Sequence, residues 1–351
     1  MKGCLMPDPD IITPQNNFFL LGQEDAERVV LDAYNNRKLH SSWLISGEEG
    51  IGKTTFAYKF ARFLLDEKRG NNSLNTSPDS PSNCLVTKGS HPDLKIIERD
   101  YVEADRKKLI KSIKEGEKID ENTRRNFRKS AIIKVDDVRT INEFLSKKSS
   151  QDGWRVVIID SIDDMNAAAS NALLKILEEP PAKSILLLIS HNVGRLLPTI
   201  KSRCAKLMLK PLAENMVISL LRRYRPDLSE DKIKGVAKIS SGSIGKALRY
   251  VDGDALSMYE NLEHIVFSGK NFKLDDMLDW VNKAIAEEEK YILAKELILK
   301  FCSDNIISSQ NVEEMALAWE NAIRSFRQTD SLNMDKKQGL INIIGKLCKL
   351  N

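Results

Sequence analysis

The segment from Gly47 to Thr54, Gly-Glu-Glu-Gly-Ile-Gly-Lys-Thr, constrains the fold of this chain more than any other feature. It matches the phosphate-binding loop pattern, in which four residues separate two glycines and a Lys-Thr pair follows. The apolar run at 43–46 indicates a short buried strand before the loop, and apolar periodicity predicts a helix over 55–65. This context predicts a nucleotide-binding loop, and the alternative is a glycine-rich turn that kept the shape without the ligand.

Each residue type in this loop has a distinct predicted task. The glycines allow backbone N–H groups to wrap phosphates at a helix N-terminus. Lys53 is expected to reach the β- and γ-phosphates, and Thr54 to hold Mg²⁺. The predicted nucleotide-binding residues of the loop are Gly47, Gly50, Gly52, Lys53, Thr54 and Thr55.

A second carboxylate for Mg²⁺ is expected at the end of a buried strand. Asp160 closes the β-branched run that starts at Arg155, so it is the candidate, and the alternative is a strand-end Asp that caps the next helix. Hydrolysing members of the large oligomeric ATPase class carry Glu at the next position, where this chain has Ser161. Asp163 and Asp164 offer no obvious substitute. We therefore expect ATP binding without hydrolysis.

The pattern of elements changes along the chain. Strands and helices alternate from 43 to 209, with further buried strands predicted at 155–160 and 184–190, which favours a parallel α/β sheet. Only helical patterns follow Leu212. Breaks near Gly253 predict one small helical group over 210–255 and a longer one over 256–351.

Composition and charge exclude several classes of protein. No stretch of 18 apolar residues occurs, so no membrane span is expected, and the first ten residues lack the apolar core of a secretory signal; a cytoplasmic location follows. The net charge of +4 equals the excess of 11 basic over seven acidic residues within 99–129, 11 − 7 = 4. The interleaved acids favour a solvated insertion there over a phosphate-binding surface.

Five scattered cysteines form no CxxC pair, so neither a disulfide framework nor a sequence-local zinc site is predicted.

Several longer strings resemble clamp-loader subunits. Residues 170–181, Ser-Asn-Ala-Leu-Leu-Lys-Ile-Leu-Glu-Glu-Pro-Pro, are similar to their signature helix, and 196–204 end in their Ser-Arg-Cys motif. With Gly-Ser-His-Pro-Asp-Leu at 89–94 and the stretch 153–160, they resemble most the delta-prime type of bacterial DNA polymerase III, in its alphaproteobacterial form. The resemblance covers nearly all of 1–209 and, more weakly, 242–249.

This resemblance implies an architecture and partners. It implies an AAA+ P-loop domain over 1–209, a helical lid over 210–255 and an oligomerising collar over 256–351. Family members sit in a five-membered ring with ATPase subunits and a clamp-opening subunit, which loads the sliding clamp on primed DNA during replication. The delta-prime type is usually a rigid stator that does not hydrolyse ATP. Any DNA polymerase activity would belong to the holoenzyme, because no residues here form a polymerase site.

The resemblance also assigns further site residues. Arg203 matches the arginine finger that acts in trans on a neighbouring subunit's nucleotide, and the alternative is a surface salt bridge. Ser190 or His191 falls at the first sensor, although a strand-end histidine satisfied by backbone is an equal alternative for His191. Lys246 stands at the second sensor, and a solvated helix lysine is the alternative.

The chain departs from the family in two respects. Many relatives bind zinc through four cysteines after the first helix, whereas 66–92 holds only Cys84 and His91, so no zinc is predicted. Many delta-prime subunits also have a degraded loop, whereas Lys53 and Thr54 are intact here.

Three classes of function remain to be distinguished. The first is the stator of a clamp loader, with residues 273–351 mediating oligomerisation. The second is an autonomous P-loop ATPase or nucleotide kinase, and the third is a stand-alone DNA-binding protein that uses 99–129. The collar prediction rests on apolar residues at helical spacing, and an ordinary intramolecular bundle is its alternative. These residues are Ile292, Leu293, Leu297, Ile298 and Phe301.

Overall fold

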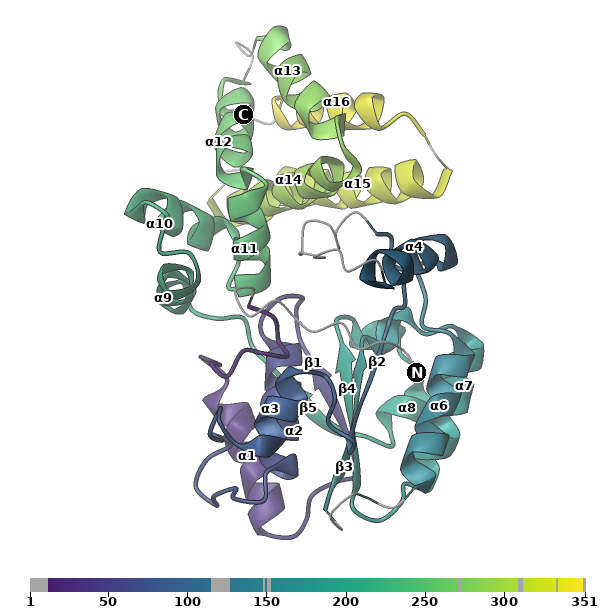
Figure 1. The fold of residues 1–351 in the computed structure, drawn as a ribbon. Helices are drawn as coiled ribbons and strands as arrows, with labels where there is room; N and C mark the ends of the chain where they lie inside the picture. Colours follow the sequence, from purple (N-terminus) through teal and green to yellow (C-terminus); the bar gives the residue numbers. More distant parts are fainter. Residues whose placement is uncertain are drawn as a thin grey trace. The chain divides into compact units, whose positions relative to one another are not determined.

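The computed structural model of this protein describes residues 12–114, 127–147, 149, 153–269, 273–308, 312–332 and 334–349. Its contacts divide the chain into two compact units, Met1–Met216 and Val217–Asn351. The first unit contains a sheet covered by helices, and the described residues of the second are helical (Figure 1).

The first unit is built on a five-stranded parallel sheet in the order β2-β3-β4-β1-β5. The strands are β1 (Ser42–Ser46), β2 (Leu94–Glu98), β3 (Arg155–Asp160), β4 (Ser184–Ser190) and β5 (Ala205–Met208). β4 pairs with both β1 and β3, so the carboxyl ends of β1 and β3 lie on either side of the same strand. Ligands of open α/β sheets bind at this carboxyl edge.

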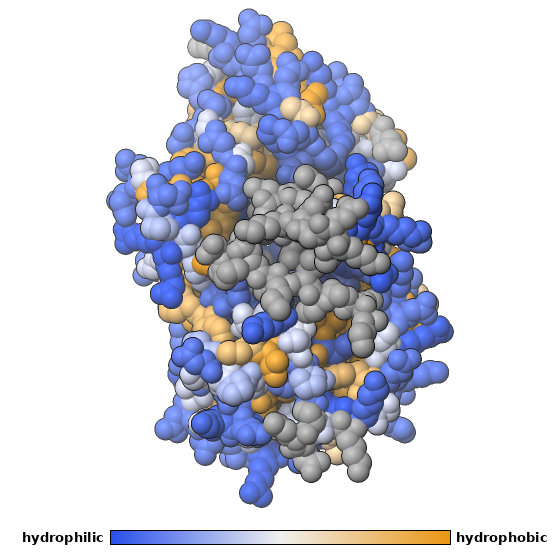
Figure 2. Space-filling view, viewed as in Figure 1, coloured by the Kyte–Doolittle hydropathy of each residue, from blue (hydrophilic) through white to orange (hydrophobic). Residues whose placement is uncertain are grey.

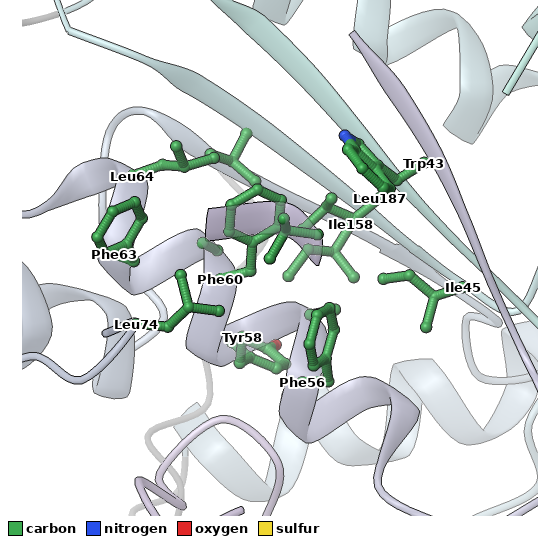
Figure 3. Close-up of a cluster of buried hydrophobic side chains, with 14 of the residues drawn as sticks. Trp43, Ile45, Phe56, Tyr58, Phe60, Phe63, Leu64, Leu74, Ile158 and Leu187 are labelled. Carbon is green, nitrogen blue, oxygen red and sulfur yellow. The ribbon is translucent and has the colours of Figure 1, made fainter. Parts of the chain in front are cut away.

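Both faces of the sheet carry helices, because the strands are apolar on both sides. One core packs the face with Val156 and Ile158 against α1 (Glu24–Asn35), α2 (Lys53–Leu65) and α3 (Pro81–Thr87). In Figure 3 the side chains of Phe56 and Phe60 lie among those of the strand residues of this cluster.

The opposite face, with Val157 and Ile159, has its own core. It packs against α6 (Val135–Ser146), α7 (Ala167–Glu178) and α8 (Pro198–Lys201). Adjacent residues of β3 thus point to opposite cores, as the two-residue period of a strand requires. The predicted parallel α/β sheet with helices on both faces is confirmed.

The second unit contains the later helices. They are α9 (Glu214–Tyr224, which begins at the end of the first unit), α10 (Glu230–Ile239), α11 (Ile244–Asp252), α12 (Ala255–Phe267), α13 (Leu274–Ile285), α14 (Glu288–Ser308), α15 (Val312–Leu332) and α16 (Lys336–Leu347). The prediction of helices alone after Leu212 therefore holds for the described residues.

The two predicted helical groups pack together inside this unit. A Cβ atom added at Gly235 of α10 would lie 2.7 Å from Leu256 of α12. Glu296 of α14 accepts hydrogen bonds from Arg249 at 3.2 Å and from the Tyr250 hydroxyl at 3.0 Å, which ties α11 to α14. The separation into domains at 210–255 and 256–351 remains a prediction.

Of the five apolar residues predicted for a collar surface, three lie inside their own bundle. Leu297, Ile298 and Phe301 are completely buried, whereas Ile292 is 41 % exposed. For these three, burial is explained by the intramolecular bundle, so they do not form an exposed surface of the unit.

The helices α3 and α4 (Glu103–Lys114) and the strand β5 are among the elements that were not predicted from the sequence. The residues Asn, Ser and Pro over 71–82 predict a loop. The helix α3 nevertheless begins at Pro81, because Ser80 caps its N-terminus by accepting from the Asn83 N–H. The helix α4 forms within the charged segment, and the short edge strand β5 carries a lysine and an exposed methionine.

Several basic side chains in the described part of the charged segment form ion pairs with acids in or beside that segment. Lys107 lies 3.0 Å from Glu103, Arg106 lies 3.3 Å from Asp100, and Lys129 lies 2.9 Å from Glu98. Residues 115–126 of this segment lie outside the described part of the chain.

Hydrophilic side chains cover most of the described surface on the face shown in Figure 2. Among the described helices, none is both long enough and apolar enough to cross a membrane.

Candidate functional site

The phosphate-binding loop connects β1 to α2 at the carboxyl edge of the sheet. Gly47, Gly50 and Gly52 have φ angles of +144°, +77° and +98°, a region that residues with side chains rarely adopt. A Cβ atom at Gly47 would also lie 2.6 Å from the carbonyl oxygen of Leu209. The glycines therefore permit both the loop conformation and its close packing against the chain that leaves β5.

Lys53 is folded back onto this loop. Its Nζ donates hydrogen bonds to the carbonyl oxygen of Gly47 at 2.7 Å and to that of Glu48. The side chain is 3 % exposed, and this burial lowers the pKa of Lys53 to about 8, although Asp160 and nearby acids act in the opposite direction. A phosphate oxygen is a charged and therefore stronger acceptor than these carbonyls.

Thr54 and Asp160 meet across β4. The Thr54 hydroxyl donates to Asp160 Oδ2 at 2.8 Å, which brings the first turn of α2 to the end of β3. Burial raises the pKa of Asp160, and the Thr54 hydrogen bond opposes that rise. A hydroxyl and a carboxylate oxygen are the hard ligands that Mg²⁺ takes beside nucleotide phosphates. The two predicted Mg²⁺ ligands are thus adjacent, and Thr55 follows Thr54 on the same turn.

The Asp163 carboxylate is a hydrogen-bonding centre that the sequence did not reveal. Its Oδ2 accepts from the Ser161 hydroxyl at 2.7 Å and from the His191 N–H at 2.6 Å. Its Oδ1 accepts from the Ser190 hydroxyl at 3.0 Å and from the Asn192 N–H at 3.2 Å. Burial alone would raise the pKa of Asp163, but these four hydrogen bonds outweigh it and lower the pKa.

This centre links the ends of β3 and β4. Asp163 lies on a short 3₁₀ turn, Ile162–Asp164, which returns the chain from β3 towards Ser190 at the end of β4. The hydroxyls of Ser161 and Ser190 both donate to the Asp163 carboxylate. Ser161, the residue after Asp160, therefore has a hydrogen bond that supports the turn. The neighbouring Asp164 lies 3.2 Å from Arg99.

Arg203 forms an ion pair within the chain. Its Nη2 lies 2.7 Å from Glu178 Oε1, and its Nη1 donates to the carbonyl oxygen of Thr199 at 3.0 Å. Glu178 is the last residue of α7, and the Arg203 side chain is 34 % exposed. The surface salt bridge considered for Arg203 is present in the isolated chain.

Arg203 lies near the amino ends of the strands, whereas the phosphate-binding loop lies at their carboxyl ends. Ala205, which starts β5, is in register with Trp43 near the start of β1, whereas the loop follows the other end of β1. Since a strand rises about 3.3 Å per residue, the length of β1 separates Arg203 from its own phosphate-binding loop. This geometry excludes Arg203 from the site of its own chain.

Lys246 belongs to the second unit, where it lies in the first turn of α11, and its backbone N–H donates to Ser243 Oγ at 3.1 Å. Its assignment to the nucleotide site remains a prediction.

The segment around His91, where no zinc site is predicted, is held by hydrogen bonds. His91 Nε2 lies 3.1 Å from Ser82 Oγ, and His91 Nδ1 accepts from the Asp93 N–H at 3.1 Å. Burial lowers the pKa of His91, in keeping with a neutral ring that serves both contacts. Among the described residues, no three His, Cys, Asp or Glu side chains gather to hold a metal ion. The absence of zinc stays a prediction.

The sequence of this chain is similar to those of known DNA polymerase III subunits. Residues 22–213 match the family described as "DNA polymerase III, delta subunit". DNA polymerase III subunit delta' of Pseudomonas aeruginosa is 31 % identical over 202 residues, which cover 58 % of this chain and 53 % of that protein. Its Escherichia coli counterpart is 30 % identical over 245 residues, 68 % of this chain and 62 % of that one.

Two further similarities extend along more of the chain. DNA polymerase III subunit gamma of Buchnera aphidicola is 25 % identical over 315 residues, which cover 88 % of this chain and 75 % of that protein. The solved structure of a gamma subunit-related protein from Thermotoga maritima has a TM-score of 0.44 and 18 % identity, and covers 93 % of this chain and 98 % of that one. The matched stretches span less than two thirds of the two delta' relatives.

Proposed function

This chain belongs to the DNA polymerase III delta-subunit family, an AAA+ clamp-loader family, and we propose that it is the non-catalytic stator of a clamp loader. In this role it would help to load the sliding clamp on primed DNA within the replicative holoenzyme. Its proposed partners are the other subunits of a five-membered ring, in the cytoplasm.

The observation that carries this proposal is the engaged carboxylate of Asp163. Hydrolysis needs a side chain that is free to orient the attacking water, and in the large oligomeric ATPase class that side chain is a glutamate. Ser161 stands where that group is expected, and all four hydrogen bonds at Asp163 come from Ser161, Ser190 and the backbone of 191–192. Asp164 is turned towards Arg99. The engagement of Asp163 and the serine at position 161 support the proposal that a nucleotide held by the loop would not be hydrolysed.

We propose that the loop binds ATP with Mg²⁺. The N–H groups at the start of α2 would receive the phosphates, Lys53 would move from its carbonyl partners to phosphate oxygens, and Thr54 with Asp160 would hold the cation. The adjacency of the Thr54 and Asp160 oxygens supports this assignment, because both are hard ligands. Bound Mg²⁺ would neutralise phosphate charge.

The proposed contribution of Arg203 is made in trans. A guanidinium is always charged and binds phosphate oxygens through a planar fork, which suits an arginine finger. The position of Arg203, one strand length from its own loop, supports a role at a neighbour's nucleotide.

The second unit is proposed to supply the assembly surface. α15 and α16 border a groove of about 350 Å³, lined by Leu317, Ala318 and Ile343 among others, and Leu317 is 57 % exposed. Exposed apolar side chains beside such a groove are costly in water, and a helix of a neighbouring ring subunit would cover them.

The alternative is an autonomous P-loop ATPase or nucleotide kinase. The purified chain is tested with radiolabelled ATP and Mg²⁺, alone and with nucleoside monophosphate acceptors. The stator predicts no turnover above that of Lys53→Ala protein. Sustained turnover at typical enzyme rates of about 1 per second or more, lost in Lys53→Ala, would contradict it. Stand-alone DNA binding through 99–129 finds less support, because Arg106, Lys107 and Lys108 are paired with neighbouring acids.

A further inference from the structure

Arg62 is a buried cation in the middle of α2. Its side chain is 1 % exposed and lies in an apolar stretch of the helix between Phe60 and Phe63. Burial lowers the pKa of Arg62 to about 10, so the group is still charged at neutral pH. Among the described residues no carboxylate lies within ion-pair distance of it, and its Nε has no hydrogen-bond partner. Such a charge is costly to bury, so its partners must compensate.

The partners of Arg62 all belong to one segment and one helix face. Nη1 donates to the carbonyl oxygen of Asn17 at 3.1 Å, and Nη2 donates to that of Gln15. The guanidinium carbon lies 4.1 Å from the centre of the Phe18 ring and 5.9 Å from that of Tyr58. We call residues 15–23 the strap. Two carbonyls and an aromatic face of the strap thus converge on a single side chain.

The other end of the strap lies against the phosphate-binding loop. A Cβ atom added at Gly52 would be 3.1 Å from Leu20 Cδ1, so Leu20 covers that glycine. Gln23 Nε2 lies 3.4 Å from the carbonyl oxygen of Ile51 and 2.9 Å from that of Lys210. The segment that Arg62 fixes is therefore the segment that supports two consecutive residues of the loop.

We propose that Arg62 is a positioning residue for the phosphate-binding loop. By fixing the strap, it holds Leu20 and Gln23 against Gly52 and Ile51 and keeps the loop in the conformation that presents its N–H groups to a triphosphate. The proposal deepens the nucleotide site proposed above and rests on it for the ligand, but the positioning itself is a property of the chain without nucleotide.

The test uses Arg62→Met in the full-length chain. Methionine keeps much of the volume but leaves the Gln15 and Asn17 carbonyls without their donor, so the free energy of unfolding of the variant is measured beside the mobility of the loop. The readout is the mobility of loop amides in protein labelled with ¹⁵N-glycine, of which the chain has 17. We expect the order parameter of the Gly52 N–H to fall from about 0.85 towards 0.6 or below. Gly235 in the second unit is the internal reference.

Three further variants test the contacts that link Arg62 to Gly52. Leu20→Ala removes the support without touching Arg62 and should loosen Gly52 in the same way. Arg62→Lys keeps the charge but lacks the planar fork, so it should restore little of the order. Lys59→Met is the matched control on the same helix, because it removes an ion pair with Glu27 that does not involve the strap, and it should leave Gly52 unchanged.

The outcomes separate this inference from the proposed function. Magnesium ATP affinity, measured by calorimetry, should fall about tenfold in Arg62→Met, the size expected when a pre-organised site becomes mobile. A rigid Gly52 in both Arg62→Met and Leu20→Ala would overturn the inference, whatever the ATP affinity. If Arg62→Met does not fold, Leu20→Ala decides. A wild-type chain that binds no ATP would contradict the proposed nucleotide site, whereas a loosened Gly52 would still uphold the positioning role.

Discussion

The Nη2 atom of Arg203 lies 2.7 Å from Oε1 of Glu178, so the proposed finger is paired with a carboxylate of its own chain before any neighbour is present. Half of the Glu178 side chain is exposed, and an exposed pair of this kind contributes little to stability. A nucleotide with Mg²⁺ on an adjoining subunit offers several phosphate oxygens in place of one carboxylate. In the proposed ring, the pair would therefore open at small cost.

The first prediction concerns Arg203→Ala. The variant chain should fold and assemble almost normally, because exposed substitutions usually change stability by within about 0.5 kcal/mol. Steady-state ATP hydrolysis by the reconstituted complex should fall, and clamp loading with it. Single fingers in other P-loop systems contribute on the order of 10³–10⁵ in rate, and a ring with several active sites should lose less.

Two variants serve as comparisons for Arg203. Arg203→Lys should restore little activity, because lysine lacks the planar fork. Arg139→Ala is the matched control, since Arg139 is an exposed arginine paired with Asp136 at 3.0 Å on α6. Unchanged hydrolysis in an assembled Arg203→Ala complex would return this residue to the role of a surface salt bridge.

The second prediction concerns Asp163→Asn. Asparagine keeps the shape but offers one acceptor oxygen in place of two, so some of the four donors would lose their partner. The free energy of unfolding, from urea titration, should fall by about 1–3 kcal/mol. The neighbouring Asp164→Asn, which loses only the exposed contact with Arg99, should cost less than 1 kcal/mol or so. Equal losses in the two variants would contradict the assigned role of Asp163.

The difference in unfolding free energy between wild type and Asp163→Asn should also depend on pH. The pKa of Asp163 is lowered in the folded chain from its ordinary value of 3.8. The unfolded chain therefore binds more protons as the pH falls through this range, and the stability that the charged group contributes above pH 3.8 is lost below it. The difference in unfolding free energy between wild type and Asp163→Asn should be constant near neutral pH and shrink below about pH 4.

The third prediction concerns protonation of Lys53. Its pKa is lowered to about 8 in the free chain, so part of the population is neutral at pH 8. A bound triphosphate favours the charged form, so binding should take up protons near pH 8 and the affinity should decline as the pH rises from 7 to 9. Calorimetry in two buffers with different ionisation heats measures the uptake. Lys53→Arg stays charged throughout, and any remaining decline in that variant would assign the effect to another group.

The fourth prediction concerns assembly. Leu317→Lys places a charge beside the groove between α15 and α16 and should reduce incorporation into the ring, while the isolated chain keeps its stability because the position is exposed. Leu332→Lys is the control: Leu332 is 69 % exposed on the same helix and does not line the groove. Normal ring formation by the Leu317 variant, measured by co-purification, would place the assembly surface elsewhere.

The sequence predicted the parts of the fold that local pattern controls. β3 and β4 are continuous β-branched or apolar runs because both of their faces are buried, and the loop at 47–54 is recognisable because phosphate binding demands glycines at fixed spacing. α7 contains most of the string that resembles the clamp-loader signature helix, and it ends before the Pro180-Pro181 pair, which cannot continue a helix. By contrast, β5 is an edge strand of four residues with one face exposed, and its pattern is too short to identify.

The unpredicted site residues depend on contacts between distant segments. Asp163 meets Ser190 and His191, 27 and 28 residues later, only because a 3₁₀ turn reverses the chain beside β4. Arg62 is held by carbonyls 45 and 47 residues earlier. The sequence did contain a signal for Arg62, because a charged residue inside the apolar run Phe-Ala-Arg-Phe-Leu-Leu needs a buried partner. No residue near Arg62 in the sequence identifies that partner.

If the Asp163 carboxylate cannot assist hydrolysis, ATP would be a stabilising ligand of this protein and not a substrate. In the proposed non-hydrolysing subunit, a nucleotide held beside this carboxylate would not be consumed and would act by mass action, like any ligand that binds only the folded chain. Occupancy at 100 times the dissociation constant would add about 2.7 kcal/mol to the free energy of unfolding. The melting temperature of the chain would then follow the cellular ATP concentration, and the subunit would lose part of its rigidity when energy supply falls.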